Sequence, residues 1–463
     1  MINPHQCGVS REARTRSDLL STRHGALNAA VLALLVGITV GTLVHPYMAQ
    51  QASRYALTAS IVERGTVRLD AYEHVLGVDR AVWRGHIYSD KAPGQPLAAV
   101  PVFALGKAVG VEGATNLRVD RNLGLWWVTF WCATVMGALL LVMMWRRSSK
   151  VVPKHATGAA LGVFFGTLLL PFSALLFGHV MAGALLYASY LVLDRDTRSS
   201  AVCAGLFAGF AVLVEYTAVL GVAALLIVVI WRYRSRLFPF VAGGVPAGLV
   251  LAVYNTIAFG AWYRLSYQLT AFDGIREEPE GVLHMFSSPA LSNVGTLLFS
   301  GRGLLIATPV IVIAVAAAVS QVRRDRHPDA VLAILMFGLF VLLPVFWENP
   351  WGGDSPGPRY MAPALPFLVV PTGWALQRWP LLARATIALS ALTMLAATFT
   401  DPLISRFETG GLGIWLNQVF DGEVVDTLWT MAWGPVGWVI HALLSVVLLL
   451  VSIRWTQSEP PFP

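Results

Sequence analysis

The stretch HIYSDKAPGQPLAAVPVFALGKAVG, residues 86–110, decides how the chain is laid out relative to a membrane. Residues 95–111 are apolar enough to be taken for a membrane span, but the run is short and holds Pro96, Pro101 and a lysine. Counting it as a span would also place the basic segment WRRSSK, 145–150, on the outer side. We therefore predict an interfacial or re-entrant helix, which is stable at membrane depth only where protein or a polar cavity covers its ends.

Around this stretch, the composition is that of a polytopic membrane protein. Hydrophobic residues make up 56% of the 463 residues, charged residues only 13%, and the mean hydropathy is +0.63. Windows of about 20 nearly uncharged residues, each long enough to cross a bilayer, recur along the chain. The sequence therefore predicts an all-α polytopic fold with about 12 transmembrane helices. The predicted spans are 26–44, 123–145, 156–174, 175–193, 200–215, 217–231, 238–259, 303–321, 329–347, 361–377, 383–400 and 434–453.

Basic residues set the orientation of these spans. Lys and Arg near span ends are retained on the cytoplasmic side, and every second connection is basic, beginning with the N-terminal segment. This predicts a plasma (inner) membrane protein whose transmembrane domain, 26–453, lies between cytoplasmic tails at 1–25 and 454–463. The polar N-terminal segment lacks a cleavable signal of the usual length, so the first span is predicted to be a retained anchor. The net charge of +7 follows from this topology, and no nucleic-acid partner is expected.

The outward-facing connections hold acids and cations beside apolar segments, so any chemistry is expected there. The segment ASRYALTASIVERG, 52–65, has the apolar spacing of a helix and is predicted to lie at the membrane surface. The prolines and glycines of GGDSPGPRY, 352–360, exclude a regular helix until after Arg359. The predicted outer loops are 45–122, which includes the interfacial helices, and 260–302, 348–360 and 401–433.

These loops combine residue types that suit one reaction. A carboxylate near an outer-leaflet cavity can act as a general base that deprotonates an acceptor hydroxyl. A nearby Lys or Arg suits a phosphate, and a large apolar wall suits a lipid. The combination predicts transfer of a sugar from a polyprenyl-phosphate carrier to a lipid, glycan or protein acceptor on the extracytoplasmic side.

The order of these features resembles the GT-C glycosyltransferases, in particular the branch of protein mannosyltransferases and lipid A aminoarabinose transferases. The segment 52–65 resembles the helix that follows the first acidic motif of that branch, and 88–110 resembles the later motif that leads into an interfacial helix. Within it, SDKAPG places Lys91 at the phosphate-contacting lysine of the family. The resemblance implies a GT-C-like fold and a hexosyl or pentosyl transferase of the cell envelope.

The sequence departs from the family at the expected base. The catalytic acid of the family precedes the Arg-Tyr pair, but here MAQQASRY has Gln50 and Gln51 at that place. Either another loop carboxylate serves, or the alignment with the family is shifted here, or the protein is not a standard transferase. If another carboxylate serves, we predict Asp70 or Asp90 ahead of Asp79, with Asp354 as a further possibility. The alternatives are structural, because Asp90 could pair with Lys91 or cap the following helix, and Asp70 could be a turn residue.

Three cations are predicted to bind the donor phosphate, namely Lys91, Arg359 and Arg54. Each also has an ordinary interpretation. Lys91 could extend along the membrane surface, Arg359 could pair with a loop acid, and an Arg-Tyr pair is a common membrane anchor. The residues predicted to contact the rest of the substrate are Tyr55, Tyr88, Asp354, Trp351 and Glu348.

Two other functions stay open from the sequence. A transporter or flippase of lipid-linked saccharides would also need a groove and cations, but transporters often have broken helices in two related halves. Here the polar residues are concentrated in the first outer loop, which favours an enzyme. The missing acidic motif leaves open a catalytically inactive GT-C-like subunit. No cofactor is expected, and the histidines lack the usual metal-ligand spacings, although a divalent ion is compatible with the sequence. Glu215, in VLVEYTAV, lies either at an outer tip or inside the bilayer.

Overall fold

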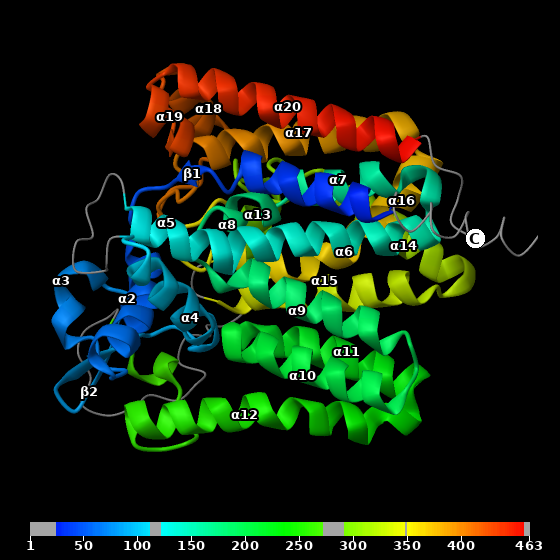
Figure 1. Cartoon of the computed structure of the whole chain (residues 1–463). Helices are drawn as coiled ribbons and strands as arrows, with labels where there is room; N and C mark the ends of the chain where they lie inside the picture. The colour runs from blue at the N-terminus through cyan, green and yellow to red at the C-terminus, as the bar shows by residue number, and fades with distance from the viewer. Residues whose placement is uncertain (1–24, 112–121, 272–290, 348–349, 458–463) are drawn as a thin grey trace, which may run out of the picture.

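A computed structural model describes residues 25–111, 122–271, 291–347 and 350–457 of the chain. Long helices run side by side as a bundle, and the short elements of the first outer loop gather at one end of it (Figure 1). Within these described ranges, five helices are long and apolar enough to cross a membrane. On one of them, Arg234–Phe259, large apolar side chains such as Phe238, Leu249 and Ile257 are exposed along the outer face, as expected for contact with lipid. The chain is an integral membrane protein.

Helices occupy each of the predicted apolar windows. The first is Gly25–Thr39. Next come α5 (Leu123–Thr129), a π-helical segment (Phe130–Thr134), α6 (Val135–Val151), α7 (Ala156–Phe165), α8 (Leu169–Ser173), α9 (Gly178–Leu193), α10 (Arg198–Val214), α11 (Val219–Arg232) and α12 (Leu237–Phe259). The last are α14 (Val310–Asp325), α15 (Pro328–Phe346), η8 (Arg359–Leu368), α16 (Val369–Arg378), α17 (Pro380–Phe399) and α20 (Val436–Gln457).

Besides the window 123–145, which the π-helical segment interrupts, two windows are broken inside. The window 156–174 is divided between α7 and α8. The window 361–377 begins as the 3₁₀ helix η8, and the α-helix α16 starts only at Val369. Pro363 and Pro366 account for the second break, because each lacks the N–H that an α-helical turn would use.

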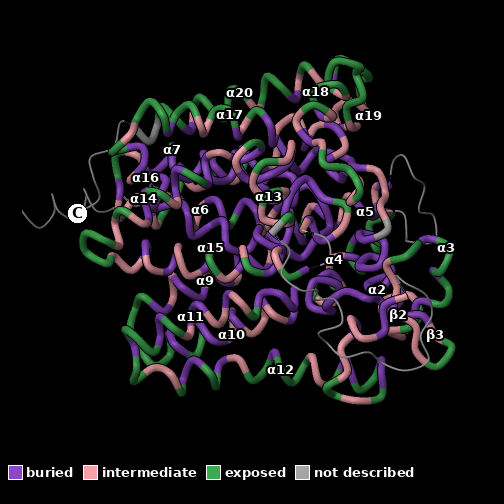
Figure 2. Tube along the Cα trace, turned by 180° about the vertical axis from the view of Figure 1, so that it is seen from behind, coloured by how far each residue is buried: buried purple, intermediate pink, exposed green. Residues whose placement is uncertain are grey.

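The first outer loop folds into α2 (Ala49–Arg64), η1 (Asp70–Tyr72), α3 (Glu73–Leu76), the hairpin β2–β3 (Ala81–Trp83, His86–Tyr88) and α4 (Gly94–Ala108). The helix expected over 95–111 is therefore present as α4. The helix predicted over 52–65 is present as α2, and protein covers its residues 50–60 on every side (Figure 2). Small residues along α2 allow α4 to pack closely, and Thr58 donates a hydrogen bond to the Pro96 carbonyl at 3.1 Å.

Gly94 fixes where α4 begins relative to the bundle. A Cβ at this position would lie 2.6 Å from backbone atoms of Leu213 and Val214, at the end of α10. Only glycine permits this approach, because the atoms in the way belong to the main chain and cannot move aside. The contact brings the SDKAPG segment next to Glu215, which follows directly after α10.

The first and last outer segments are joined by a short sheet. Strand β1 (Leu43–Val44) pairs antiparallel with β4 (Asp426–Thr427), with Leu43 opposite Thr427. The remaining outer elements are η7 (Ser266–Leu269), α13 (Leu291–Phe299), α18 (Leu412–Phe420) and α19 (Leu428–Trp433). Of these elements, α18 and α19 lie at the end of the bundle at which α2 and α3 lie (Figure 1).

Arg302 ties two of the later loops together. Its Nη1 donates to the carbonyls of Ser355 and Ile404 at 2.8 and 3.0 Å, and its Nη2 donates to those of Ser405 and Glu408 at 2.9 and 2.5 Å. The guanidinium lies 4.5 Å from the centre of the Trp351 ring. A buried cation with four backbone partners holds both loops in one arrangement.

Replacing Arg302 with methionine is expected to lower the free energy of unfolding by about 2–4 kcal/mol, because buried carbonyls lose their charged donor. Thermal unfolding of the purified protein in detergent measures this change. The matched control is Arg378→Met, since Arg378 is exposed at the end of α16 and its loss should change stability by no more than about 0.5 kcal/mol. Equal unfolding temperatures for the two variants would contradict the role of Arg302.

Candidate active site

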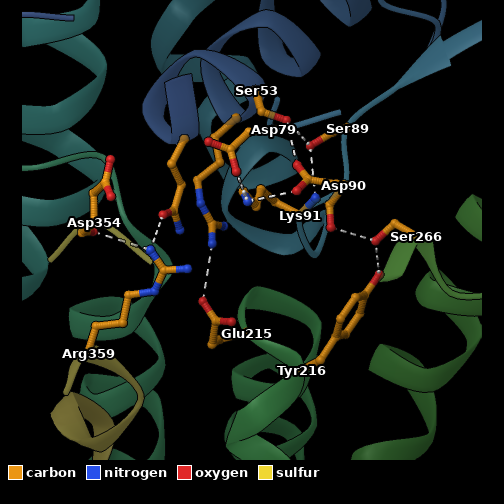
Figure 3. Close-up of polar contacts among 12 residues, drawn as sticks. Ser53, Asp79, Ser89, Asp90, Lys91, Glu215, Tyr216, Ser266, Asp354 and Arg359 are labelled. Atoms are coloured by element: carbon orange, nitrogen blue, oxygen red, sulfur yellow. Dashed lines mark hydrogen bonds and ion pairs between the residues drawn. The ribbon is translucent and has the colours of Figure 1, made fainter. Parts of the chain in front are cut away.

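A buried lysine with two carboxylate partners forms the centre of the site. The Nζ of Lys91 lies 2.7 Å from Oδ1 of Asp79 and 2.8 Å from Oδ2 of Asp90 (Figure 3). Ser53, on α2, donates to Oδ1 of Asp90 at 3.2 Å and lies 2.9 Å from the hydroxyl of Ser89. The chain bends at Asp90 and Lys91, so these two adjacent side chains pair with each other, as the sequence left open, and each also has a further neighbour, Ser53 for Asp90 and Asp79 for Lys91.

Burial and charge act in opposite directions in this group. Burial raises the pKa of Asp90 above its ordinary value of 3.8, although Lys91 opposes the shift. Burial alone would lower the pKa of Lys91, but the carboxylates of Asp79 and Asp90 outweigh it and raise the pKa above 10.5. Lys91 therefore carries its positive charge throughout the neutral range.

Arg359 brings a second cation from the loop 348–360. Its Nη1 donates to Oε1 of Gln50 at 2.5 Å and to the carbonyl of Asp354 at 3.5 Å (Figure 3). It also interacts electrostatically with Lys91. Gly353 has φ of +114°, and a Cβ there would lie 3.2 Å from the guanidinium. The glycine turn before Arg359 thus lets the loop pass directly over this side chain.

Arg54 provides a third cation, one position after Ser53 on α2. Its Nη2 lies 3.1 Å from Oε2 of Glu215, and both side chains are almost fully buried. His179, the second residue of α9, has Nδ1 3.5 Å from the same carboxylate oxygen. Three helices therefore contribute to one buried polar group, at the end of the bundle where Lys91 lies.

Several predicted residues come together here. Arg54, Asp90, Lys91 and Arg359 lie in one polar cluster, and Asp79 joins them although it was the less favoured acid. Sequence reasoning did not select His179 or commit to Glu215. An acid between two apolar spans was a usable signal for Glu215, but His179 follows an ordinary apolar segment with no motif around it.

Asp70 lies outside this cluster. Its Oδ2 is 2.9 Å from Nδ1 of His86, and its Oδ1 accepts a hydrogen bond from the backbone of Ile87 at 2.7 Å. Its side chain is 45% exposed. These contacts fasten η1 to β3, which is the turn role that the sequence left open for Asp70.

The remaining predicted contact residues have other neighbours. Tyr55 packs edge-on against Phe103 with ring centres 5.5 Å apart, and Tyr88 packs in the same way against Phe259 at 5.3 Å. Trp351 lies against Arg302. The Oδ1 of Asp354 accepts a hydrogen bond from the backbone of Arg406 at 2.8 Å. Glu348 lies outside the described residues.

Comparison with solved structures identifies the arrangement of the helices. The fold matches that of ArnT from Cupriavidus metallidurans in the apo state, with a TM-score of 0.54 over 95% of this chain and 74% of that one. The chain has the GT-C fold. The sequence identity to ArnT is 13%, so the GT-C similarity concerns the fold. No model of a known protein family and no curated protein sequence matches the chain.

Two further solved structures with GT-C folds align over most of the chain. ArnT from the same organism bound to undecaprenyl phosphate gives a TM-score of 0.49 at 12% identity, covering 94% of this chain and 76% of that one. The oligosaccharyltransferase of Archaeoglobus fulgidus, in complex with Zn and sulfate, also gives 0.49 at 12% identity, covering 83% of this chain and 53% of that one.

Proposed function

We propose that this chain is a membrane glycosyltransferase that moves a sugar from a polyprenyl-phosphate carrier to an acceptor on the extracytoplasmic side. The observation that carries the proposal is the buried Lys91, held between Asp79 and Asp90 and close to Arg359. A phosphate on a lipid requires cations in apolar surroundings, and transfer to a hydroxyl requires a proton acceptor next to them.

The cations have donors to spare for a ligand. The Nε of Arg359 and the Nε and Nη1 of Arg54 are buried and have no hydrogen-bond partner among the described residues. Buried donors without partners cost about 1–3 kcal/mol each, so a ligand with several oxygens would stabilise this arrangement. Lys91, Arg359 and Arg54 together are the proposed phosphate-binding set, and in this proposal no metal ion is needed to neutralise the phosphate.

In the proposed reaction, the acceptor oxygen attacks the anomeric carbon, and the bond between that carbon and the phosphate oxygen breaks. Polyprenyl phosphate leaves with the bonding electron pair, and its charge is taken up by the cations. The proton of the acceptor hydroxyl passes to a carboxylate of the Lys91 group.

The geometry favours Asp79 as that proton acceptor. Both oxygens of Asp90 have partners, Ser53 and Lys91, and its side chain is 9% exposed. Asp79 uses only Oδ1 among the described residues, and its side chain is 22% exposed. A base needs a lone pair that faces the substrate, so Asp79 takes this role ahead of Asp90 and Asp70. Asp90 then holds Lys91 in place.

The proposal includes the full topology expected from the sequence. All twelve apolar windows would span the membrane, with the tails 1–25 and 454–463 cytoplasmic and the site outside. The alternating basic connections support this orientation. The proposed acceptor is a lipid, glycan or protein.

Turnover separates this function from its alternatives. The protein is reconstituted into vesicles with undecaprenyl-phosphate-linked sugars and with membranes of a deletion strain as the acceptor source. We expect release of undecaprenyl phosphate, and only from donor on the side that corresponds to the cell exterior. Movement of intact donor across the vesicle would instead indicate a flippase. Binding of the lipid without release or movement would indicate an inactive subunit.

A further inference from the structure

A second group of unpaired polar atoms lies beside the proposed phosphate site. Both ring nitrogens of His179 are buried without a hydrogen-bond partner among the described residues, and Nδ1 is 3.5 Å from Glu215. The side chain of His179 is 1% exposed. Glu215 holds one edge of the Arg54 guanidinium, which leaves Nε and Nη1 of Arg54 unpaired. Such a concentration of unmatched donors and acceptors points to an absent polar ligand.

We propose that His179 and Glu215, together with Arg54, bind the sugar of the donor, and that this sugar carries no charge. The inference deepens the proposed function and rests on it. It assigns recognition of the sugar to the start of α9 and the end of α10. Arg54 then lies between the sugar and the phosphate, and Lys91 and Arg359 contact the phosphate alone.

The position of the group fits this assignment. His179 is joined to the proposed phosphate ligands through Glu215, whose Oε2 lies 3.5 Å from Nδ1 of His179 and 3.1 Å from Nη2 of Arg54. Gly178 leaves the necessary room, since a Cβ there would lie 3.1 Å from Oε2 of Glu215 and 3.3 Å from Nη1 of Arg54. The sugar of a phosphate-linked donor must lie next to the phosphate. His179, Glu215 and Arg54 lie next to the proposed phosphate site, as a sugar-binding group must.

The chemistry of the group matches sugar hydroxyls. A hydroxyl both donates and accepts, and here Glu215 accepts, Arg54 donates and the imidazole of His179 can do either. Aromatic neighbours hold the imidazole in place, with ring centres 5.0 Å away for Phe172 and 6.1 Å away for Tyr360. Fixed donors and acceptors of this kind select a substrate by the positions of its hydroxyl groups.

The charge of the group decides the class of sugar. Arg54 and Glu215 carry opposite charges, so the pair has no net charge to offer a charged sugar. The surrounding cluster combines three cations, Lys91, Arg359 and Arg54, with three carboxylates, Asp79, Asp90 and Glu215. It therefore has no surplus charge of either sign to pair with an ammonium or a carboxylate on the sugar. An uncharged hexose or pentose needs no charged partner.

The test compares lipids with and without a sugar. Microscale thermophoresis measures the Kd of undecaprenyl phosphate and of its mannose, glucose, galactose, arabinose and aminoarabinose conjugates for the full-length protein. We expect at least one neutral sugar to tighten binding about ten-fold or more over the bare lipid. His179→Ala should remove that gain and leave the Kd of undecaprenyl phosphate unchanged. His441→Ala is the matched control. His441, on α20, is also buried, but its neighbour is the hydroxyl of Thr42 and not a residue of the proposed site.

The other outcomes overturn the inference. Equal weakening of both lipids by His179→Ala would assign His179 to the phosphate, and no change in either would leave it with a structural role. Tighter binding of the aminoarabinose conjugate than of every neutral one would contradict the charge argument. If His179→Ala fails to fold, His179→Gln and the isosteric Glu215→Gln answer the same question. Failure of the proposed function has a different signature, since undecaprenyl phosphate itself would then bind neither the native protein nor any variant.

Discussion

Replacing Lys91 with methionine is expected to weaken the binding of undecaprenyl phosphate at least about 100-fold, or by about 2.7 kcal/mol. Methionine keeps the length of the apolar stem and removes the charge. The loss exceeds that of one hydrogen bond, because the change also leaves the carboxylates of Asp79 and Asp90 without their shared cation. Two uncompensated acids in a buried site repel a phosphate as well as each other.

The same substitution should also lower stability by about 3 kcal/mol or more, the usual cost of removing one member of a buried ion pair. Thermophoresis gives the affinity, and thermal unfolding gives the stability. Lys107→Met is the matched control, since Lys107 lies on α4 with its side chain 53% exposed, 3.3 Å from Glu63. Native affinity in Lys91→Met would remove the basis of the phosphate site.

Replacing Asp79 with asparagine is expected to lower turnover by about 100-fold or more, with the Kd of undecaprenyl phosphate almost unchanged. Asparagine has the same shape but cannot accept the proton of the acceptor hydroxyl. Asp90 still holds Lys91 in this variant, so the phosphate site keeps its charge and position. Single-turnover kinetics with a saturating donor separates this loss from any change in binding.

Two other aspartates provide the comparison. Asp90→Asn should weaken donor binding and stability together, because it removes a partner of both Lys91 and Ser53. Asp70→Asn should leave turnover near normal, because Asp70 only fastens the hairpin through His86 and Ile87. If Asp90→Asn is instead the variant that binds the lipid normally and does not turn over, the base is Asp90, one of the two acids that the sequence favoured.

The sequence predicted the helices well, because a bilayer imposes a minimum length and apolarity on each span. It also singled out Lys91 and Arg359, since a cation at a proline-marked bend outside a span is unusual. It did not predict how completely protein covers α2, because the apolar spacing of 52–65 does not show which segments pack on it. In the structure, Ser53 and Arg54 face a buried group of charges.

The sequence could not predict pairings between residues that are far apart in the chain. Arg54 and Glu215 are 161 positions apart, and nothing local to either one indicates the other. For a similar reason, the sequence favoured Asp70 over Asp79 and did not predict that Asp79 is the acid in contact with Lys91. Both acids lie in the same loop, and only the course of the hairpin β2–β3 decides which of them meets Lys91.

The pairing of β1 with β4 has a consequence for biosynthesis. Residues 43–44 leave the ribosome early, yet their partners, 426–427, are made only after nearly all of the apolar helices. The hydroxyl of Thr42 likewise lies 3.1 Å from Nδ1 of His441, a residue that is synthesised later still. This end of the bundle therefore cannot close during synthesis, and until then the first helix remains in the translocation machinery or the bilayer without its final neighbours. Premature termination before residue 426 should leave a product that inserts into the membrane but is rapidly degraded.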